Sequence, residues 1–376
     1  MKSKIYIIDY DKWILYTYFA LMIIGIYMQL NISSIRTDMS FFYRQGMWVI
    51  ISLFSLWFAF KKVNLLKIRP FISIFVVITA ILLILVLVFG VNVKGATRSI
   101  RIWKFSIQPS LIARIVLIMY FAHILEKKKG LLNLTTPKFF LSHFNALLIV
   151  PAIIFFLILL EKHLSPIMIS SLTLISLLFM VKVRITTIAI MVVSIIIAAF
   201  LIINLGAKYR SNRVEMYKKY SLFIPGTAEE TGLDDYQIRE SLISLAGGGI
   251  IGTGPTRGTG KHYFLPEAKT DYVFSIIGEE FGFLGALFVI LLYCLLFYRT
   301  MMISFNNKNF YLKVLGMGLA MNIFFNAFVN IGVAMSALPS TGVTLPFISY
   351  GGTSFLVNSV SIGLLLNISA KRREVA

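Results

Sequence analysis

Acidic side chains gather in one short stretch, LPEAKTDYVFSIIGEEFG, which spans residues 265–282. Only 16 of the 376 residues are Asp or Glu, yet Glu267, Asp271, Glu279 and Glu280 all lie here, where the chain runs into an apolar segment. A carboxylate in membrane hydrocarbon is costly, and a chain that keeps one there generally uses it. The stretch is therefore the first candidate for a reactive site.

The composition indicates a membrane protein. Hydrophobic residues make up 58% of the chain, charged residues make up 14%, and the mean hydropathy is +0.84; an ordinary globular domain is much less apolar. We predict an all-α, polytopic membrane protein that forms a single domain over residues 1–376. Cys294 is the single cysteine, which excludes a disulfide framework and a thiolate metal site. The net charge of +20 favours anionic lipid or an anionic substrate as partner, and we expect no nucleic acid.

Ten apolar runs are long enough to cross a membrane, because a spanning helix needs about 17 to 25 residues. A polar segment at about 206–270 separates the seventh run from the eighth, and we predict that it forms one long extracellular loop. The predicted spans cover residues 13–32, 43–60, 71–90, 108–125, 140–160, 164–181, 185–205, 272–298, 310–335 and 346–369.

Lys and Arg residues predict the orientation of the bundle, because cytoplasmic loops carry an excess of them. Most lie in connections that are internal if both termini are cytoplasmic. One short external connection breaks this pattern, since it holds Lys94, Arg98, Arg101 and Lys104. An anionic ligand on the outer face would explain these four cations, because Arg and Lys both bind phosphate oxygens.

In this orientation Asp271 lies at the outer mouth of the eighth span, where it can ionise, and it is the candidate base. The alternative is an ordinary residue at a helix N-terminus. In a straight helix Glu279 and Glu280 would lie about 12 to 13 Å deeper. A structural pairing with a cation such as Arg114 is the favoured interpretation for these two. Arg114 itself needs a partner inside the membrane, and we expect an internal carboxylate.

Two further segments could line the same cavity. Glu161 and His163 lie at the outer rim of the fifth span, where they could face the cavity or form a snorkelling cap. The segment AGGGIIGTGPTRGTGKHYFLP, residues 246–266, lacks the spacing of a Walker loop. It could approach a ligand closely, with Arg257 and Lys261 available, or it could be a flexible linker.

The segment LPSTGVTLPFISYGGTSF, residues 338–355, combines Pro and Gly at the external entry to the tenth span. A broken helix at membrane depth is tolerated only where it lines a cavity or is buried in protein, so this segment is predicted to form a pocket wall. HExxH, GxSxG and Cys/His metal spacings are absent from the sequence, which gives hydrolase and zinc functions no support.

Four long, irregular blocks resemble the shape, elongation, division and sporulation (SEDS) family, which includes FtsW, RodA and SpoVE. The blocks are GATRSIRIWKFSIQPS, YQIRESLISLAGGGIIGTG, LPEAKTDYVFSIIGEEFGFLGA and TGVTLPFISYGGTS. Departures from the family pattern are Ser99 after the arginine of the first block, Leu111 and Arg114 after Gln-Pro-Ser, and His163 in the fifth span. These departures leave open a divergent paralogue with weak or specialised activity.

The resemblance implies an enzyme of the bacterial cytoplasmic membrane that polymerises lipid II into peptidoglycan glycan strands, with a class B penicillin-binding transpeptidase as partner. It implies Asp271 as the essential catalytic residue and a divalent cation, Mg or Mn, as a possible cofactor; we assign no metal ligands and expect no organic cofactor. Alternatives are a lipid II flippase and a non-catalytic scaffold for the transpeptidase. The predicted substrate-binding residues are Lys94, Arg98, Arg101, Arg210, Gln237, Arg257, Lys261, Glu267, Ser349 and Gly351.

Overall fold

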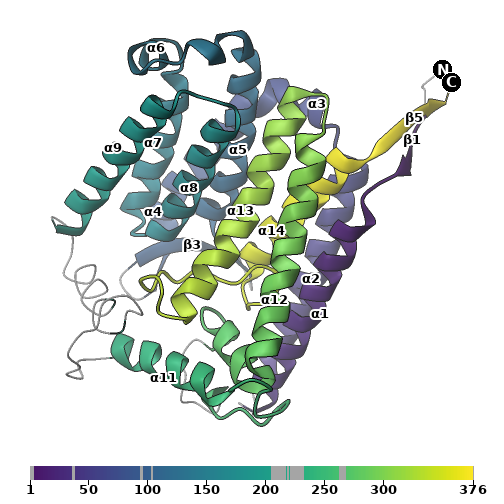
Figure 1. Ribbon diagram of the computed structural model, residues 1–376, viewed down its shortest axis with the longest axis vertical. Helices are drawn as coiled ribbons and strands as arrows, with labels where there is room; N and C mark the ends of the chain where they lie inside the picture. The colour runs from purple at the N-terminus through teal and green to yellow at the C-terminus, as the bar shows by residue number, and fades with distance from the viewer. Residues whose placement is uncertain are drawn as a thin grey trace.

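The computed structural model describes residues 4–35, 39–93, 96–102, 105–204, 217, 220, 233–261 and 268–375, which form a helical bundle (Figure 1). Helices occupy all ten predicted ranges. Among the described residues, six helices are long and apolar enough to cross a membrane, and a seventh span results if α6 and α7, bent by 74°, count as one. In the other ranges α2, α8 and α9 are helical but shorter or less apolar. The prediction of a mostly helical, multi-pass membrane protein is confirmed.

The helices account for most of the described residues. Their bounds are α1 (Lys12–Ile35), α2 (Ser40–Lys61), α3 (Leu65–Ile68), η1 (Arg69–Phe71), α4 (Ile72–Phe89), α5 (Pro109–Lys127), η2 (Lys129–Leu134), α6 (Pro137–His143), α7 (Ala146–Leu160), α8 (Leu164–Met180), α9 (Ile185–Asn204), α11 (Leu233–Gly247), α12 (Val273–Phe305), α13 (Phe310–Ala334) and α14 (Gly352–Ser369).

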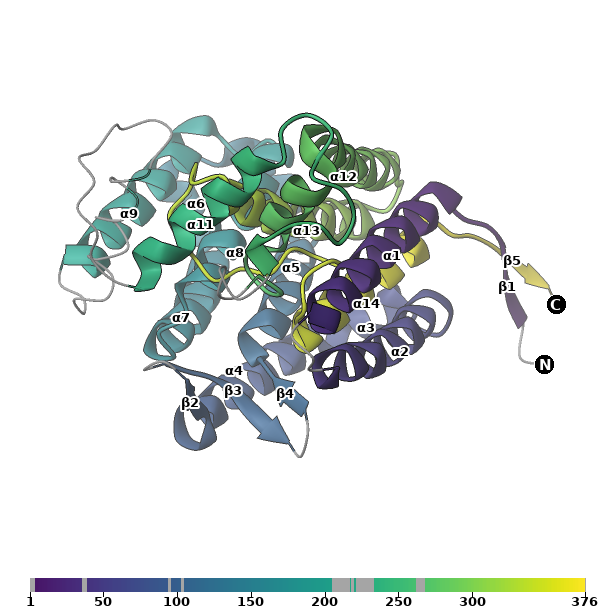
Figure 2. The same cartoon turned by 90° about the horizontal axis from the view of Figure 1, so that it is seen from below.

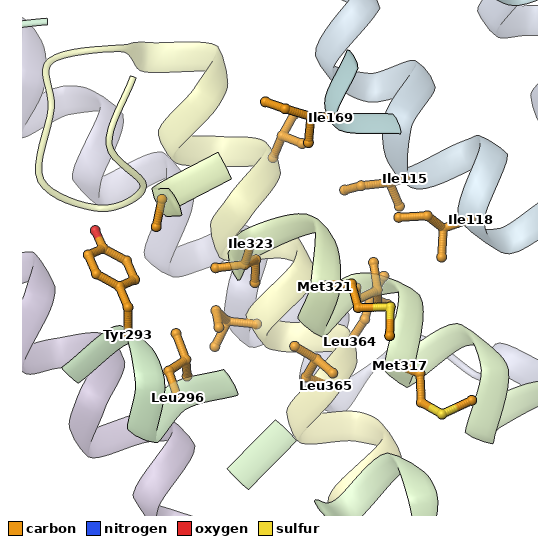
Figure 3. Packing of buried hydrophobic residues seen from close by; sticks show 14 of the residues in the cluster. Ile115, Ile118, Ile169, Tyr293, Leu296, Met317, Met321, Ile323, Leu364 and Leu365 are labelled. Atoms are coloured by element: carbon orange, nitrogen blue, oxygen red, sulfur yellow. The ribbon is translucent and has the colours of Figure 1, made fainter. Parts of the chain in front are cut away.

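The centre of the bundle is formed by α5, α13 and α14. In the most apolar stretches of α13 and α14, 78% of the residues are buried, against 22% in α4 and α12. Figure 3 shows the packing at this centre, where Ile118, Met321 and Leu365 come from three different helices. A membrane helix that is apolar all round and mostly exposed faces lipid, so α4 and the long part of α12 are peripheral.

Small residues allow α14 to pack closely on α2. A Cβ atom at Gly363 would lie 2.5 Å from the Leu56 carbonyl oxygen, so only glycine permits this approach. Near the end of α14, Asn367 Nδ2 donates to the carbonyls of Ala59 at 3.0 Å and Phe60 at 2.8 Å. These bonds satisfy carbonyls that the end of α2 would otherwise leave without partners.

Two small antiparallel sheets accompany the helices, and the all-α prediction did not include them. β1 (Lys4–Asp9) pairs with β5 (Lys371–Val375), which brings the two ends of the chain together beside the bundle (Figure 1). β2 (Val91–Val93), β3 (Ala96–Ile102) and β4 (Phe105–Ile107) form the second sheet between α4 and α5. These segments are short, and apolar and polar residues do not alternate regularly enough in them to predict strands from the sequence.

The predicted long loop at 206–270 contains a helix, α11, which lies across one end of the bundle (Figure 2). Ser241 of α11 fixes this position, because its hydroxyl donates to the Ala334 carbonyl at 2.8 Å and lies 2.6 Å from Ser275 Oγ. The helix therefore contacts the start of α12 and the end of α13, the two elements that flank Asp271.

Candidate active site

Asp271 lies in the turn before α12, opposite the loop that connects α13 to α14. Its side chain is half-buried, so a ligand can reach it while the protein limits its motion. Gly342 of the loop faces the carboxylate: a Cβ atom built there would lie 3.7 Å from Asp271 Oδ2. Gly342 has a φ of +70°, which glycine adopts without strain. The loop therefore presents bare backbone to the candidate base.

Two side chains hold the backbone at this turn. Asn330 Nδ2 of α13 donates to the Asp271 carbonyl at 2.8 Å. The Ser349 hydroxyl donates to the neighbouring Thr270 carbonyl and accepts a bond from Leu345 N–H at 2.8 Å. Buried backbone groups need such partners, and here the partners come from the elements that surround the site. Ser349, which we predicted to bind substrate, thus has its hydroxyl engaged with the main chain.

Arg114 of α5 is buried beside a row of asparagines on α13. Asn322, Asn326 and Asn330 recur every fourth residue and therefore share one face of the helix. Arg114 Nε donates to Asn322 Oδ1 at 2.9 Å and Nη1 donates to Asn326 Oδ1 at 3.3 Å. The expected carboxylate partner for Arg114 is wrong: among the described residues, neutral amide oxygens take that place. The positive charge is consequently solvated but not neutralised.

The span predicted at 272–298 is present as part of α12, but the helix is not straight, because it is broken at Gly282, where φ is +66° and ψ is −166°. The glycine-rich segment caps both broken ends. Thr253 N–H donates to the Glu279 carbonyl at 2.9 Å, and Phe283 N–H donates to the Gly249 carbonyl at 2.9 Å. The segment is therefore neither a phosphate loop nor a free linker where the structure describes it; its backbone completes an interrupted helix.

Several glycines are required for this contact between the segment and α12. A Cβ atom at Gly248 would lie 1.9 Å from the Gly278 carbonyl oxygen, and one at Gly252 would lie 2.2 Å from the Glu280 carbonyl oxygen. Such distances are impossible for any side chain. The glycine-rich composition of residues 246–260 thus reflects the close approach of two backbones.

Glu279 and Glu280 are structural, as favoured, but their partners come from this same segment and α1, not from Arg114. Glu280 forms a fully buried ion pair with Lys261 and accepts a bond from Asn31 Nδ2 at 2.7 Å. Glu279 Oε1 accepts bonds from Thr259 N–H at 2.6 Å and from the next backbone N–H at 3.1 Å. Lys261 is 0% exposed, which corrects its prediction as a substrate-binding residue.

A second buried group of titratable residues lies in the turn between α7 and α8. Burial raises the pKa of Glu161 to about 8, although the nearby Arg98 guanidinium opposes the rise. Neither carboxyl oxygen of Glu161 has a hydrogen-bond partner in the described parts of the chain. Burial also lowers the pKa of His163 to about 3, so this imidazole is neutral, and its Nδ1 lies 3.0 Å from Ser110 Oγ.

This group is connected to the loop beside Asp271. Arg98 Nη2 of β3 donates to the Lys162 carbonyl at 3.2 Å, so one of the four predicted outer cations reaches the turn. Ser165, in the first turn of α8, donates to the Thr341 carbonyl next to Gly342. The turn after α7 and the loop before α14 thus form adjoining parts of one region.

The other predicted site residues are distributed around this region, and their roles stay predictions. Arg101 on β3 and Arg257 after α11 are exposed, Gln237 of α11 is half-buried, and Gly351 precedes α14 with its backbone against Thr344. Lys94, Arg210 and Glu267 lie outside the described residues. In the described ranges, groups of three or more His, Cys, Asp or Glu that could hold a metal are absent.

Sequence reasoning missed the amide side chains that organise the site. Gln29 in α1 and Asn330 in α13 each sit in an otherwise apolar run, and both are nearly fully buried. Polar residues inside a spanning helix usually mark functional or packing positions. That signal was present in the sequence, and the spacing of Asn322, Asn326 and Asn330 reinforced it.

Comparisons with known proteins find relatives over nearly the whole chain. Residues 10–374 match the family described as "Cell cycle protein", FtsW/RodA/SpoVE. A probable peptidoglycan glycosyltransferase FtsW of Geobacter metallireducens is 32% identical over 97% of this chain and 96% of its own length. A probable peptidoglycan glycosyltransferase FtsW of Coxiella burnetii is 30% identical over 96% of each chain.

Solved structures share the fold. The rod shape determining protein RodA of Thermus thermophilus superposes with a TM-score of 0.69 at 22% identity, over 96% of this chain and 97% of its own. A chain from a structure described as "Structural coordination of polymerization and crosslinking by a peptidoglycan synthase complex" gives a TM-score of 0.75 at 22% identity, over 96% of this chain and 98% of its own.

Proposed function

The chain belongs to the FtsW/RodA/SpoVE family of cell cycle proteins, and on this premise we propose that it is a peptidoglycan glycosyltransferase. Its substrate is lipid II, the undecaprenyl-diphosphate-linked disaccharide pentapeptide, which it joins into glycan strands. The observation that carries the proposal is the half-buried Asp271 carboxylate, which lies against the bare backbone of the loop at Gly342.

Asp271 acts as the general base. Its carboxylate accepts the proton of the acceptor sugar's 4-hydroxyl as that oxygen forms a bond to the donor's anomeric carbon, and the bond from this carbon to the diphosphate breaks. The undecaprenyl diphosphate leaves with the electron pair. A half-buried carboxylate suits this role, because a substrate can reach it while the protein around it limits its motion.

Cations stabilise the charge that develops on the leaving diphosphate. Arg98 is the favoured contact, because its guanidinium already reaches the turn beside the loop of Gly342, and exposed Arg101 and Arg257 can add to it. Arginine matches phosphate oxygens with two parallel hydrogen bonds. Arg114 contributes from further away through a charge that no described carboxylate neutralises.

A divalent cation fits this set of residues as a companion of the diphosphate. Mg²⁺ usually keeps several waters and binds one or two carboxylates together with substrate phosphates, so a cluster of three protein ligands is not needed. Glu161 would hold it, since both of its oxygens are buried without hydrogen bonds in the described residues. The cation would neutralise negative charge on the leaving group.

We propose that the site faces the outside of the bacterial cytoplasmic membrane and that both termini are cytoplasmic. The distribution of Lys and Arg supports this orientation, and the pairing of β1 with β5 requires both ends to lie on one side. The partner is a class B penicillin-binding transpeptidase that cross-links the strands. The fold shared with a chain of a peptidoglycan synthase complex supports such a partner.

The test is polymerisation of labelled lipid II by purified protein in liposomes. Asp271→Asn should reduce the rate about 10²- to 10⁴-fold, the usual contribution of a general base. Asp9→Asn is the matched control, because Asp9 lies on β1, outside the helical bundle, and this variant should keep full activity. Glycan synthesis at the normal rate by Asp271→Asn, or lipid II translocation without polymer by the unaltered protein, would contradict the proposal.

A further inference from the structure

Three consecutive carbonyls ahead of α12 are bound by donors from other elements. The Lys269 carbonyl accepts bonds from Gln29 Nε2 at 3.1 Å and from Tyr350 N–H at 2.8 Å. The next two carbonyls accept from the Ser349 hydroxyl and from Asn330 Nδ2. Residues 269–271 precede the helix and have no helical ladder of their own, so these contacts define where the segment lies.

Each of the three side chains also binds the facing loop. Asn330 Nδ2 donates to the Val343 carbonyl at 2.6 Å, and Gln29 Nε2 donates to the Ile348 carbonyl at 3.3 Å. Ser349 belongs to the loop itself and accepts the bond from its Leu345 N–H. Each side chain therefore joins the segment that carries Asp271 to the loop that faces its carboxylate.

We propose that Gln29, Asn330 and Ser349, here called the carbonyl clamp, are positioning residues for the reaction. They do not touch the substrate; they fix the backbone of residues 269–271 so that the Asp271 carboxylate keeps its place relative to the loop. This inference rests on the proposed role of Asp271 as the base.

Burial and origin of these side chains support a positioning role. Gln29 is 2% exposed, Asn330 1% and Ser349 3%, which leaves no surface for a ligand. Gln29 and Asn330 come from α1 and α13, two spanning helices, so the turn is tied to regular elements on both sides. A displacement of about 1 Å at a reacting group can cost 10²-fold in rate, and the loss of one of these bonds permits such a displacement.

The experiment measures kcat and KM for lipid II polymerisation per folded molecule, with the folded fraction taken from size-exclusion chromatography of each variant. Asn330→Ala should lower kcat about 10- to 100-fold and leave KM within about threefold of the unaltered protein, because the base moves while the substrate contacts stay. Ser349→Ala should lower kcat about tenfold, and Ser349→Thr, which keeps the hydroxyl, should recover most of it.

Asn367→Ala provides the matched control. Asn367 is also a buried asparagine that donates to backbone carbonyls, but those belong to Ala59, Phe60 and Val63 at the end of α2. Its loss should lower the folded fraction and leave kcat per folded molecule within about twofold. A merely structural role of the carbonyl clamp would give Asn330→Ala the same result.

The outcomes separate this inference from the proposed function. If Asp271→Asn is inactive while Asn330→Ala and Ser349→Ala both keep the kcat of Asn367→Ala, the carbonyl clamp is overturned and the glycosyltransferase stands. If Ser349→Ala raises KM instead of lowering kcat, Ser349 contacts substrate and does not position the base. If Asn330→Ala does not fold, the Ser349→Ala and Ser349→Thr pair decides. Full activity of Asp271→Asn would contradict the proposed role of Asp271 as the base, and the inference about the carbonyl clamp would fail with it.

Discussion

Two buried cations, Lys261 and Arg114, have opposite surroundings. Lys261 is 0% exposed and is paired with the Glu280 carboxylate, with Asn31 Oδ1 at 2.8 Å as a further acceptor. Arg114 is 4% exposed and is bound by the amide oxygens of α13. The charge of Lys261 is therefore neutralised by a carboxylate, whereas the charge of Arg114 is solvated only by amide dipoles.

We interpret the difference as that between a cation with a structural role and a cation whose charge remains available. A buried charge is costly unless it is paired, so Lys261 with its carboxylate can serve to hold the broken helix α12 to its capping segment. A charge held by neutral groups keeps its field. Arg114 therefore projects positive potential toward the region where the diphosphate is proposed to bind, at some cost in stability.

The largest expected effect is on stability, at Lys261. Lys261→Met removes one member of a buried ion pair and leaves Glu280 without its counter-ion, which should lower the free energy of unfolding by about 3 to 5 kcal/mol. Thermal unfolding in detergent measures the loss. The double variant Lys261→Met/Glu280→Leu should be clearly more stable than Lys261→Met alone; if the two unfold at the same temperature, the pair is not the reason for the burial.

Arg114→Met tests the second cation of the comparison, the one without a carboxylate partner among the described residues. The rate of lipid II polymerisation should fall about tenfold, which corresponds to roughly 1.4 kcal/mol of lost electrostatic stabilisation. The loss of stability should be smaller than for Lys261→Met, because no carboxylate is left unpaired. Activity and unfolding temperature are measured on the same preparation. Normal activity with a large loss of stability would make Arg114 a structural cation like Lys261.

Asn322→Asp sharpens the comparison, because it gives Arg114 the carboxylate that Lys261 already has. The side chain keeps its shape and its acceptor oxygen, so the free energy of unfolding should change by less than about 1 to 2 kcal/mol. The polymerisation rate should nevertheless fall about threefold, since the positive field is cancelled. An unchanged rate would show that the charge of Arg114 is not used.

The smallest effect concerns the dependence of stability on pH. Burial raises the pKa of Glu161 from 4.5 to about 8, so the folded protein binds this proton more tightly than the unfolded chain. The stabilisation is complete below pH 4.5 and is lost as the pH rises toward 8. Glu161→Gln should therefore raise the unfolding temperature at pH 8.5 and leave it nearly unchanged at pH 4.5. Equal shifts at both pH values would contradict this assignment.

Much of the architecture could be predicted, because the spanning helices coincide with runs of apolar residues in the sequence. Runs of apolar residues located helices in all ten predicted ranges but not α11, and the four irregular blocks indicated the family that the comparisons confirm. The break at Gly282 could not be predicted, because glycine is common in spanning helices. The helix can be interrupted at this glycine only because the backbone of residues 248–254 supplies the hydrogen bonds that the helix loses there.

The sequence indicates which charged residues are buried, but it does not show which groups bind them. The sequence indicates three buried charges, at Arg114, Glu279 and Glu280. Pairing them with one another was the simplest prediction, because it needs no further buried charges. Lys261 and Thr259, which bind Glu280 and Glu279, lie 19 and 20 positions away in a segment outside the helix. Other partners lie much further away: Asn31 reaches Glu280 across 249 positions and Arg114 reaches Asn322 across 208. Neither composition nor helical spacing carries information at that range.

The packing of α14 against α2 has a consequence for how the protein is made. Asn367 binds the Ala59 carbonyl across 308 positions, and Gly363 lets α14 lie directly against the backbone of Leu56. Translation delivers α2 to the membrane long before α14 exists, so this surface of the growing chain must wait beside lipid or the insertion machinery. The return of α14 to the earliest helices is therefore expected to be the late, slow stage of assembly.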